Sequence, residues 1–172
     1  MTEARPDPPL RSTYWVRPDR LLAGPYPGGW ISGETQRRVR ALVEAGVTLF
    51  LDLTEPGEVD SYLVPLTTEA KRQGRTVHHQ RLPIPDMEVP SDEHMIRILD
   101  TIDAALAEGE TVYVHCLGGI GRTGTAVGCY LVRHGMEGED ALKSIVQMRG
   151  GLLDSPQTDE QHAMVRGWRE GR

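Results

Sequence analysis

Residues 111–124 have the sequence TVYVHCLGGIGRTG, an apolar run followed by a glycine-rich loop with one cysteine and one arginine. The β-branched and aromatic residues of the run predict a buried strand, and the apolar residues after the loop predict a helix. Glycines at such a junction let the backbone N–H groups turn toward one point, or let a ligand come close to the backbone. The stretch therefore predicts an anion-binding loop between a strand and a helix.

The loop offers a site for a phosphate-sized anion. Its backbone N–H groups, the positive end of the following helix and the guanidinium of Arg122 can all donate to phosphate oxygens. The residues expected to bind the phosphoryl group are Leu117, Gly118, Gly119, Ile120, Gly121 and Arg122. Since these groups stabilise the charge of a transferred phosphoryl group, we expect neither a metal ion nor a cofactor.

Cys116 begins the same loop and is the predicted nucleophile. The N–H groups and Arg122 favour its thiolate, which would lie under a bound phosphate and attack phosphorus. The side chain of His115 points away from Cys116 in a strand, so we expect it to hold the loop and polarise the cysteine rather than act as its base. The hydroxyl of Thr123 is expected to donate to the sulfur and to help it leave in a second step.

Strands and helices alternate along the rest of the chain. Short runs of β-forming residues predict further strands at residues 20–23, 47–53 and 76–82. Helical spacing of apolar residues predicts helices at residues 34–46, 58–73, 91–109, 122–135, 139–150 and 157–168, with Ser91 as an N-cap. This alternation predicts an α/β fold in which helices flank a central sheet.

Length and charge limit the class of protein. A chain of 172 residues suggests one domain, which we place at residues 11–172, after a disordered, proline-containing tail at residues 1–10. The net charge of −6 argues against a nucleic-acid partner. No apolar run approaches the roughly 18 residues of a membrane span, and the first residues lack the pattern of a secretory signal. We therefore expect a cytoplasmic protein with no membrane partner.

The other cysteine and the paired histidines predict no metal site. Cys129 falls on the apolar face of the helix after the loop, where we expect it to be a core residue. Two cysteines in a chain of this length do not form a disulfide framework, and their spacing does not suggest zinc. His78 and His79 are neighbours in a predicted strand and face opposite sides, which argues against one shared metal.

The stretch HCLGGIGRTG resembles the signature motif of the cysteine-dependent protein tyrosine and dual-specificity phosphatases. The positions that this family fixes are matched by His115, Cys116, Gly119, Arg122, Thr123 and Gly124. The Gly118-Gly119 pair is most similar to kinase-associated phosphatase and to small bacterial relatives. The resemblance extends from about Tyr14 to Trp168 and implies the fold of dual-specificity phosphatases, with a central mixed, largely parallel sheet. It implies a hydrolase that removes phosphate from phosphotyrosine through a phosphocysteine intermediate, with phosphoserine and phosphothreonine as further candidate substrates.

The resemblance also implies a general acid and a residue that positions water. The family places its acid in a mobile loop before the nucleophile, and PIPDMEVP supplies Asp86 there. Glu88 is the rival acid, whereas Asp92 is expected to belong to a helix start. The stretch QTDEQ is similar to the family's glutamine loop, so Gln157 would position the water and Gln161 would support it.

Two further sets of residues lie near predicted turns. In larger relatives a loop glutamate pairs with the arginine of the motif, which makes Glu55 and Glu58 candidates for Arg122. We expect packing roles for Trp15, Tyr26 and Trp30, which lie near glycine and proline turns.

Other functions share a cysteine or phosphate loop. A phosphatase of phosphoinositides, nucleotides or RNA 5′-phosphates would use the same chemistry, but phosphoinositide enzymes often place lysines where this loop has Leu117 and Ile120. A rhodanese-like sulfur carrier typically has one residue fewer before its arginine. A phosphate-binding module without turnover would not need Cys116, Arg122 and Asp86 together. We therefore favour a phosphorylated protein or peptide as the substrate, with phosphate or a similar oxyanion in the loop.

Overall fold

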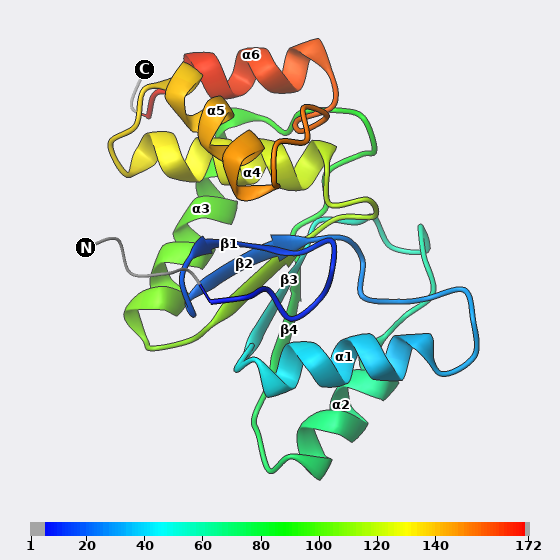
Figure 1. Ribbon diagram of the computed structural model, residues 1–172. Coiled ribbons are helices and arrows are strands. Elements are labelled where there is room, and N and C mark those ends of the chain that lie inside the picture. Colours follow the sequence, from blue (N-terminus) through cyan, green and yellow to red (C-terminus); the bar gives the residue numbers. More distant parts are fainter. Residues whose placement is uncertain (1–5, 171–172) are drawn as a thin grey trace.

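The structure is a computed structural model, and it describes residues 6–170. Within this range the chain forms a five-stranded sheet and six helices (Figure 1). The strands are β1 (Tyr14–Arg17), β2 (Leu21–Gly24), β3 (Leu49–Asp52), β4 (His78–Arg81) and β5 (Val112–His115). The helices are α1 (Glu34–Glu44), α2 (Leu63–Arg72), α3 (Asp92–Ala107), α4 (Gly121–Arg133), α5 (Gly138–Met148) and α6 (Asp159–Gly167).

The strand order is β1-β2-β5-β3-β4, with β1 antiparallel to β2 and every other neighbouring pair parallel. Helices α1 and α2 cover one face of the sheet, and α3 to α6 cover the other (Figure 1). Strand β5 lies at the centre and is buried on both faces, since Tyr113 contacts the first layer while Val112 and Val114 contact the second. This arrangement confirms the predicted α/β fold with a mixed, largely parallel sheet.

Two elements differ from the sequence prediction. Residues 14–17 form β1, which was not predicted, because a four-residue strand gives too short an alternation to distinguish from a turn. The helix predicted at residues 58–73 begins only at Leu63, because the residues before it form a loop that carries Glu58 to the glycine-rich loop. Ser91 does cap α3, as predicted, and accepts a hydrogen bond from the N–H group of His94 (3.2 Å).

The three aromatic residues near turns have different environments. Trp15 is buried in the layer beneath α1, and Tyr26 is half-buried against the same layer. Trp30, in contrast, is 92% exposed, so the prediction that it packs in the protein is wrong. The backbone N–H groups of Trp30 and Ile31 donate to the carboxylate of Glu34 in α1, and the indole lies outside. Cys129 is fully buried, as expected.

The amino-terminal segment was expected to be a disordered tail. Residues 1–5 of that segment lie outside the described residues. The rest contacts the domain, because Leu10 packs against the α1 layer and the carbonyl of Asp7 accepts a hydrogen bond from the indole of Trp15 (3.5 Å). Within residues 6–170, no helix has both the length and the apolar character needed to cross a membrane.

Candidate active site

The glycine-rich loop leaves the carboxyl end of β5 and enters α4 at Gly121 (Figure 1). Cys116 is buried at its base, while Leu117 and Gly118 are exposed. The N–H groups of residues 117–122 donate to no acceptor within residues 6–170. With the positive end of α4 behind them, these donors can bind an oxyanion above Cys116.

The end of β2 supports this loop from behind. Gly119 has a φ of +70°, and a Cβ atom there would lie 2.3 Å from the carbonyl carbon of Gly24. The N–H group of Tyr26 donates to the carbonyl of Leu117 (2.9 Å). A glycine is therefore required at position 119 both by its backbone conformation and by its contact with a neighbouring chain segment.

Arg122 is buried, and three hydrogen bonds to two residues fix its guanidinium. Glu58 accepts from both terminal nitrogens (2.8 and 2.6 Å), and the carbonyl of Ile84 accepts from Nη1 (3.0 Å). Of the two candidate glutamates, the structure therefore pairs Glu58 with Arg122, while Glu55 donates its backbone N–H to Glu58 (2.9 Å). The hydrogen bonds from Arg122 outweigh burial and lower the pKa of Glu58. The pair holds the guanidinium in one plane beside the loop.

Asp86 lies at the mouth of the site. Its Oδ1 is 3.2 Å from Nη2 of Arg122, and 60% of its side chain is exposed. The turn that presents it includes Met87, which has a φ of 66° and donates its N–H to Asp86 Oδ1 (3.0 Å). The rival Glu88 contacts the site through its backbone carbonyl, which accepts from Gln161. Asp92 lies in the first turn of α3, as expected.

The two glutamines lie against the start of α4 and differ in their bonding. A Cβ atom on Gly121 would be 2.9 Å from Oε1 of Gln161 and 3.1 Å from Oε1 of Gln157. Gln161 is buried, and its amide oxygen accepts from the N–H groups of Gln157 (3.0 Å) and Thr158 (3.1 Å). Its amide nitrogen donates to the carbonyl of Glu88 (3.2 Å). Gln161 thus ties α6 to the Asp86 loop, while the side chain of Gln157 is exposed.

His115 is buried beneath the loop, and its hydrogen bonds define its tautomer. Its Nδ1 lies 3.0 Å from the carbonyl oxygen of Cys116, so this nitrogen carries the proton. Its Nε2 therefore accepts the hydroxyl proton of Tyr62 (2.6 Å). Burial lowers the pKa of His115, which agrees with a neutral ring. These bonds fix the carbonyl of Cys116, and within residues 6–170 the ring forms no hydrogen bond with the sulfur.

Asp52 and Tyr62 were missed by the sequence prediction. Asp52 ends β3 and accepts hydrogen bonds from His79 (3.0 Å), Arg81 (3.1 Å) and Thr54 (2.9 Å from N–H and 2.6 Å from the hydroxyl). Burial acts to raise the pKa of Asp52, but the bonds from His79 and Thr54 and the nearby His115 outweigh it and lower the pKa. A charged residue at the end of an apolar strand was the available signal for this network.

The predicted hydrogen bond from Thr123 to the cysteine sulfur is not made in this structure. Within residues 6–170, the hydroxyl of Thr123 is buried and has no hydrogen-bond partner. Thr123 lies in the first turn of α4, where the residue is fully buried. The hydroxyl of Ser155 instead supports the loop from this side by donating to the carbonyl of Ile120 (2.7 Å).

Comparison with known proteins places this geometry in a family. The model of the Swiss Army Knife protein DSP-PTPase phosphatase domain (PTP-SAK) matches residues 10–170. Human dual specificity protein phosphatase CDC14C is 28% identical over 151 residues, which cover 83% of this chain and 31% of the relative. The chain thus spans about a third of the length of that relative.

Solved structures show the same fold. The active form of Tk-PTP superimposes with a TM-score of 0.71 at 26% identity, over 90% of this chain and 94% of that one. A form of kinase associated phosphatase with its catalytic cysteine replaced by serine gives a TM-score of 0.70 at 22% identity, over 90% of each chain. Together with the match over residues 10–170, these comparisons show that the chain belongs to the PTP-SAK family of dual-specificity and protein tyrosine phosphatase domains.

Proposed function

We propose that the protein is a cysteine-dependent phosphomonoesterase that removes phosphate from phosphotyrosine, and also from phosphoserine and phosphothreonine, in proteins. One observation carries the proposal. Cys116 lies at the base of a loop whose N–H groups have no acceptor among residues 6–170, beside an arginine that Glu58 fixes and that Asp86 approaches to 3.2 Å. A nucleophile, an oxyanion site and an acid are thus brought together.

In the first step the thiolate of Cys116 attacks phosphorus, and a sulfur–phosphorus bond forms as the bond to the leaving oxygen breaks. Asp86 in its acid form gives its proton to that oxygen. Arg122 and the loop N–H groups stabilise the equatorial phosphoryl oxygens. His115 holds the carbonyl of Cys116, so the nucleophile keeps its place under the phosphate.

In the second step water replaces the sulfur. Gln157 orients the water, while Gln161 holds the Asp86 loop against α6. The carboxylate of Asp86 now takes a proton from the water, whose oxygen bonds to phosphorus as the sulfur–phosphorus bond breaks. The buried hydroxyl of Thr123 has no hydrogen-bond partner within residues 6–170, so it is free to donate a hydrogen bond to the departing sulfur. Phosphate leaves, and the thiolate and the acid form of Asp86 are restored.

The nucleophile is tested by Cys116→Ser. We expect this variant to lose turnover of p-nitrophenyl phosphate by about a thousandfold or more, because serine is not ionised at neutral pH. It should still bind inorganic phosphate, since the N–H groups and Arg122 are unchanged. Normal turnover by the variant, or a single burst of product from the unchanged protein without further turnover, would overturn the proposal.

The general acid is tested by Asp86→Asn, with Glu88→Gln as the matched control two residues away. On a phosphotyrosine peptide, Asp86→Asn should lower kcat by about 10²- to 10⁴-fold. The loss should be smaller on p-nitrophenyl phosphate, because nitrophenolate leaves more readily without a proton. If Glu88→Gln shows this dependence on the leaving group and Asp86→Asn does not, the acid is Glu88.

Substrate class is tested by comparing kcat/KM for phosphotyrosine and phosphothreonine peptides and for a soluble phosphoinositide. The loop positions 117 and 120 are apolar, with Leu117 exposed at the rim, so a highly charged headgroup finds no added cation there. We expect phosphotyrosine to be the best substrate. A phosphoinositide hydrolysed faster than either peptide would contradict the choice of substrate.

A further inference from the structure

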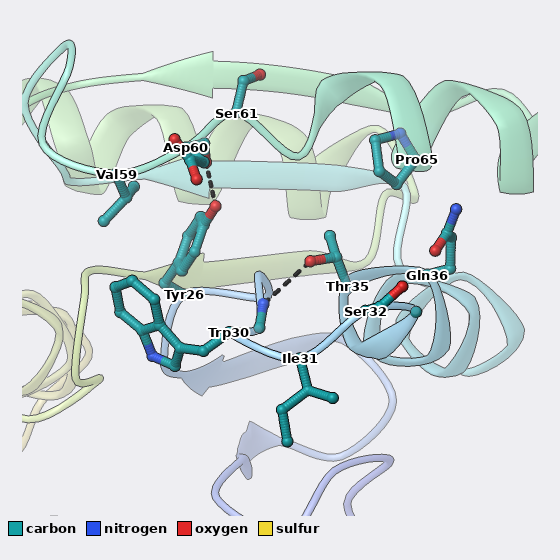
Figure 2. A pocket seen from close by; sticks show the side chains of 12 residues that line it. Tyr26, Trp30, Ile31, Ser32, Thr35, Gln36, Val59, Asp60, Ser61 and Pro65 are labelled. Atoms are coloured by element: carbon teal, nitrogen blue, oxygen red, sulfur yellow. Dashed lines mark hydrogen bonds between the residues drawn. The ribbon is translucent and has the colours of Figure 1, made fainter.

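A pocket of about 370 Å³ opens beside the glycine-rich loop that follows Cys116, which we call the phosphate loop. It lies between the segment that joins β2 to α1 and the segment that precedes α2 (Figure 2). Tyr26, which lines it, donates its backbone N–H to Leu117 of the phosphate loop (2.9 Å). Val59, on the opposite side, follows Glu58, which holds Arg122. Both walls therefore continue directly from the active site.

One wall displays an exposed indole on an ordered loop. The carboxylate of Glu34 accepts from the N–H groups of Trp30 (3.0 Å) and Ile31 (3.4 Å). The carbonyl of Gly28 accepts from Arg38 (2.7 Å), so α1 fixes the loop from both ends. Trp30 is nonetheless 92% exposed. A large aromatic side chain that is held outward next to a catalytic site is typical of a binding surface.

The opposite wall is acidic. Asp60 lines the pocket and is exposed, and its backbone carbonyl accepts from the hydroxyl of Tyr26 across the pocket (Figure 2). Its carboxylate forms no ion pair within residues 6–170. None of the residues that line this pocket is a lysine or an arginine. An aromatic face opposite an unpaired carboxylate complements a cation on a flexible apolar stem.

We propose that this pocket binds a lysine or arginine side chain of the protein substrate, located within a few residues of the phosphorylated residue. The stem of that side chain packs on Trp30, and its charge pairs with Asp60. This inference rests on the proposed function, since it names the sequence around the residue that the active site dephosphorylates. Peptides with a basic residue at the right position are therefore preferred substrates.

The test uses phosphotyrosine peptides that carry lysine, glutamate, leucine or alanine at each position from three before to three after the phosphotyrosine. At one position, kcat/KM for lysine should exceed that for alanine by about five- to tenfold, and glutamate should be the poorest. The ratio of lysine to alanine should fall toward one in Asp60→Asn and in Trp30→Ala. It should be unchanged in Glu108→Gln, which alters an exposed carboxylate at the far end of α3. Added salt should reduce the ratio.

The ratio compares kcat/KM for two peptides on the same variant, so a smaller fraction of folded protein lowers both values equally and leaves the ratio unchanged. No preference for lysine at any position would overturn the inference, as would a preference that both variants retain or a stronger preference for leucine. In those cases turnover of the alanine peptide shows that the proposed function stands. If neither the peptides nor p-nitrophenyl phosphate are turned over, the proposed function fails as well.

Discussion

A single buried guanidinium organises the candidate active site. Only 1% of the Arg122 side chain is exposed, and a charge at such a position must be paired to be tolerated. Glu58 provides that pairing with two short bonds, although it comes from a different loop. Nη2 of the guanidinium, which donates to Glu58, also lies 3.2 Å from Oδ1 of Asp86. Arg122 thus joins Asp86, the glycine-rich loop and the loop before α2.

Glu58→Gln tests the importance of this pairing. The amide keeps the shape of the side chain but supplies neither the charge nor the second acceptor, so Arg122 loses its fixed plane. We expect the free energy of unfolding to fall by about 2 kcal/mol. We expect kcat/KM to fall by about 10- to 100-fold because the guanidinium is misplaced. Urea unfolding and turnover of p-nitrophenyl phosphate measure the two effects.

Glu55→Gln is the control, since Glu55 contacts Glu58 only through its backbone N–H. It should leave both quantities within error of the unchanged protein. Equal effects of the two substitutions would show that Arg122 does not depend on Glu58.

At the scale of elements, the phosphate loop depends on strand β2 as much as on its own strand β5. The loop reverses over Gly119, whose position leaves no room for a side chain against the end of β2. Since β2 and β5 are parallel neighbours, their carboxyl ends meet at the same edge of the sheet. The site therefore lies where several strand ends converge, as is usual in open α/β sheets.

Gly119→Ala separates this contact from simple backbone strain. Its Cβ would lie 2.3 Å from backbone of β2, and its φ of +70° disfavours alanine. Gly109→Ala has a similar φ of +89° but nothing within 4 Å of its Cβ. The control should cost about 1 kcal/mol of unfolding free energy, whereas Gly119→Ala should cost more and also weaken phosphate binding. Thermal melts with and without phosphate distinguish the two; equal effects would rule out a role for the β2 contact.

The sequence allowed prediction of those elements whose signal is local. The strand, loop and helix around Cys116 follow from adjacent residues, and Ser91 marks the start of α3. The start of α2 and the exposure of Trp30 were predicted wrongly, because both depend on contacts between distant segments. Residues before α2 leave the helical path so that Glu58 reaches Arg122, and Glu34 bonds turn Trp30 outward. The spacing of apolar residues along the sequence does not indicate such contacts.

At the scale of the whole molecule, the two helical layers enclose a polar network in the sheet. His115 and Tyr62 bond to each other beneath the phosphate loop, and Asp52 lies 4.0 Å from His115 Nε2. Burial lowers the pKa of His115, so the folded protein holds the ring neutral where the unfolded chain would protonate it. The free energy of unfolding is therefore linked to pH through the residue that precedes Cys116.

The sign of this linkage follows from the lowered pKa of His115. Below about pH 6.5 the unfolded chain binds a proton on this residue that the folded protein does not bind. The free energy of unfolding should thus fall as pH decreases from 6.5 to 5, by at most about 1.4 kcal/mol per unit. The carboxylates with lowered pKa, Asp52 among them, act mainly below this window.

His115→Gln should remove this slope between pH 5 and 6.5, although the variant is less stable throughout. His78→Gln, at an exposed position of β4, should retain the slope. Urea unfolding at several pH values measures both. A slope that persists in His115→Gln would assign it to another group.

The contact between Gly119 and the end of β2 also determines at which stage of folding the candidate active site forms. The two segments come from distant parts of the chain, and their meeting requires closure of a long loop that includes β3, β4 and α3. Long-range parallel pairing of this kind is slow to nucleate and completes late in folding. A nascent or partly folded polypeptide therefore lacks the ring of N–H groups above Cys116, and the candidate anion site forms only once the tertiary structure is complete.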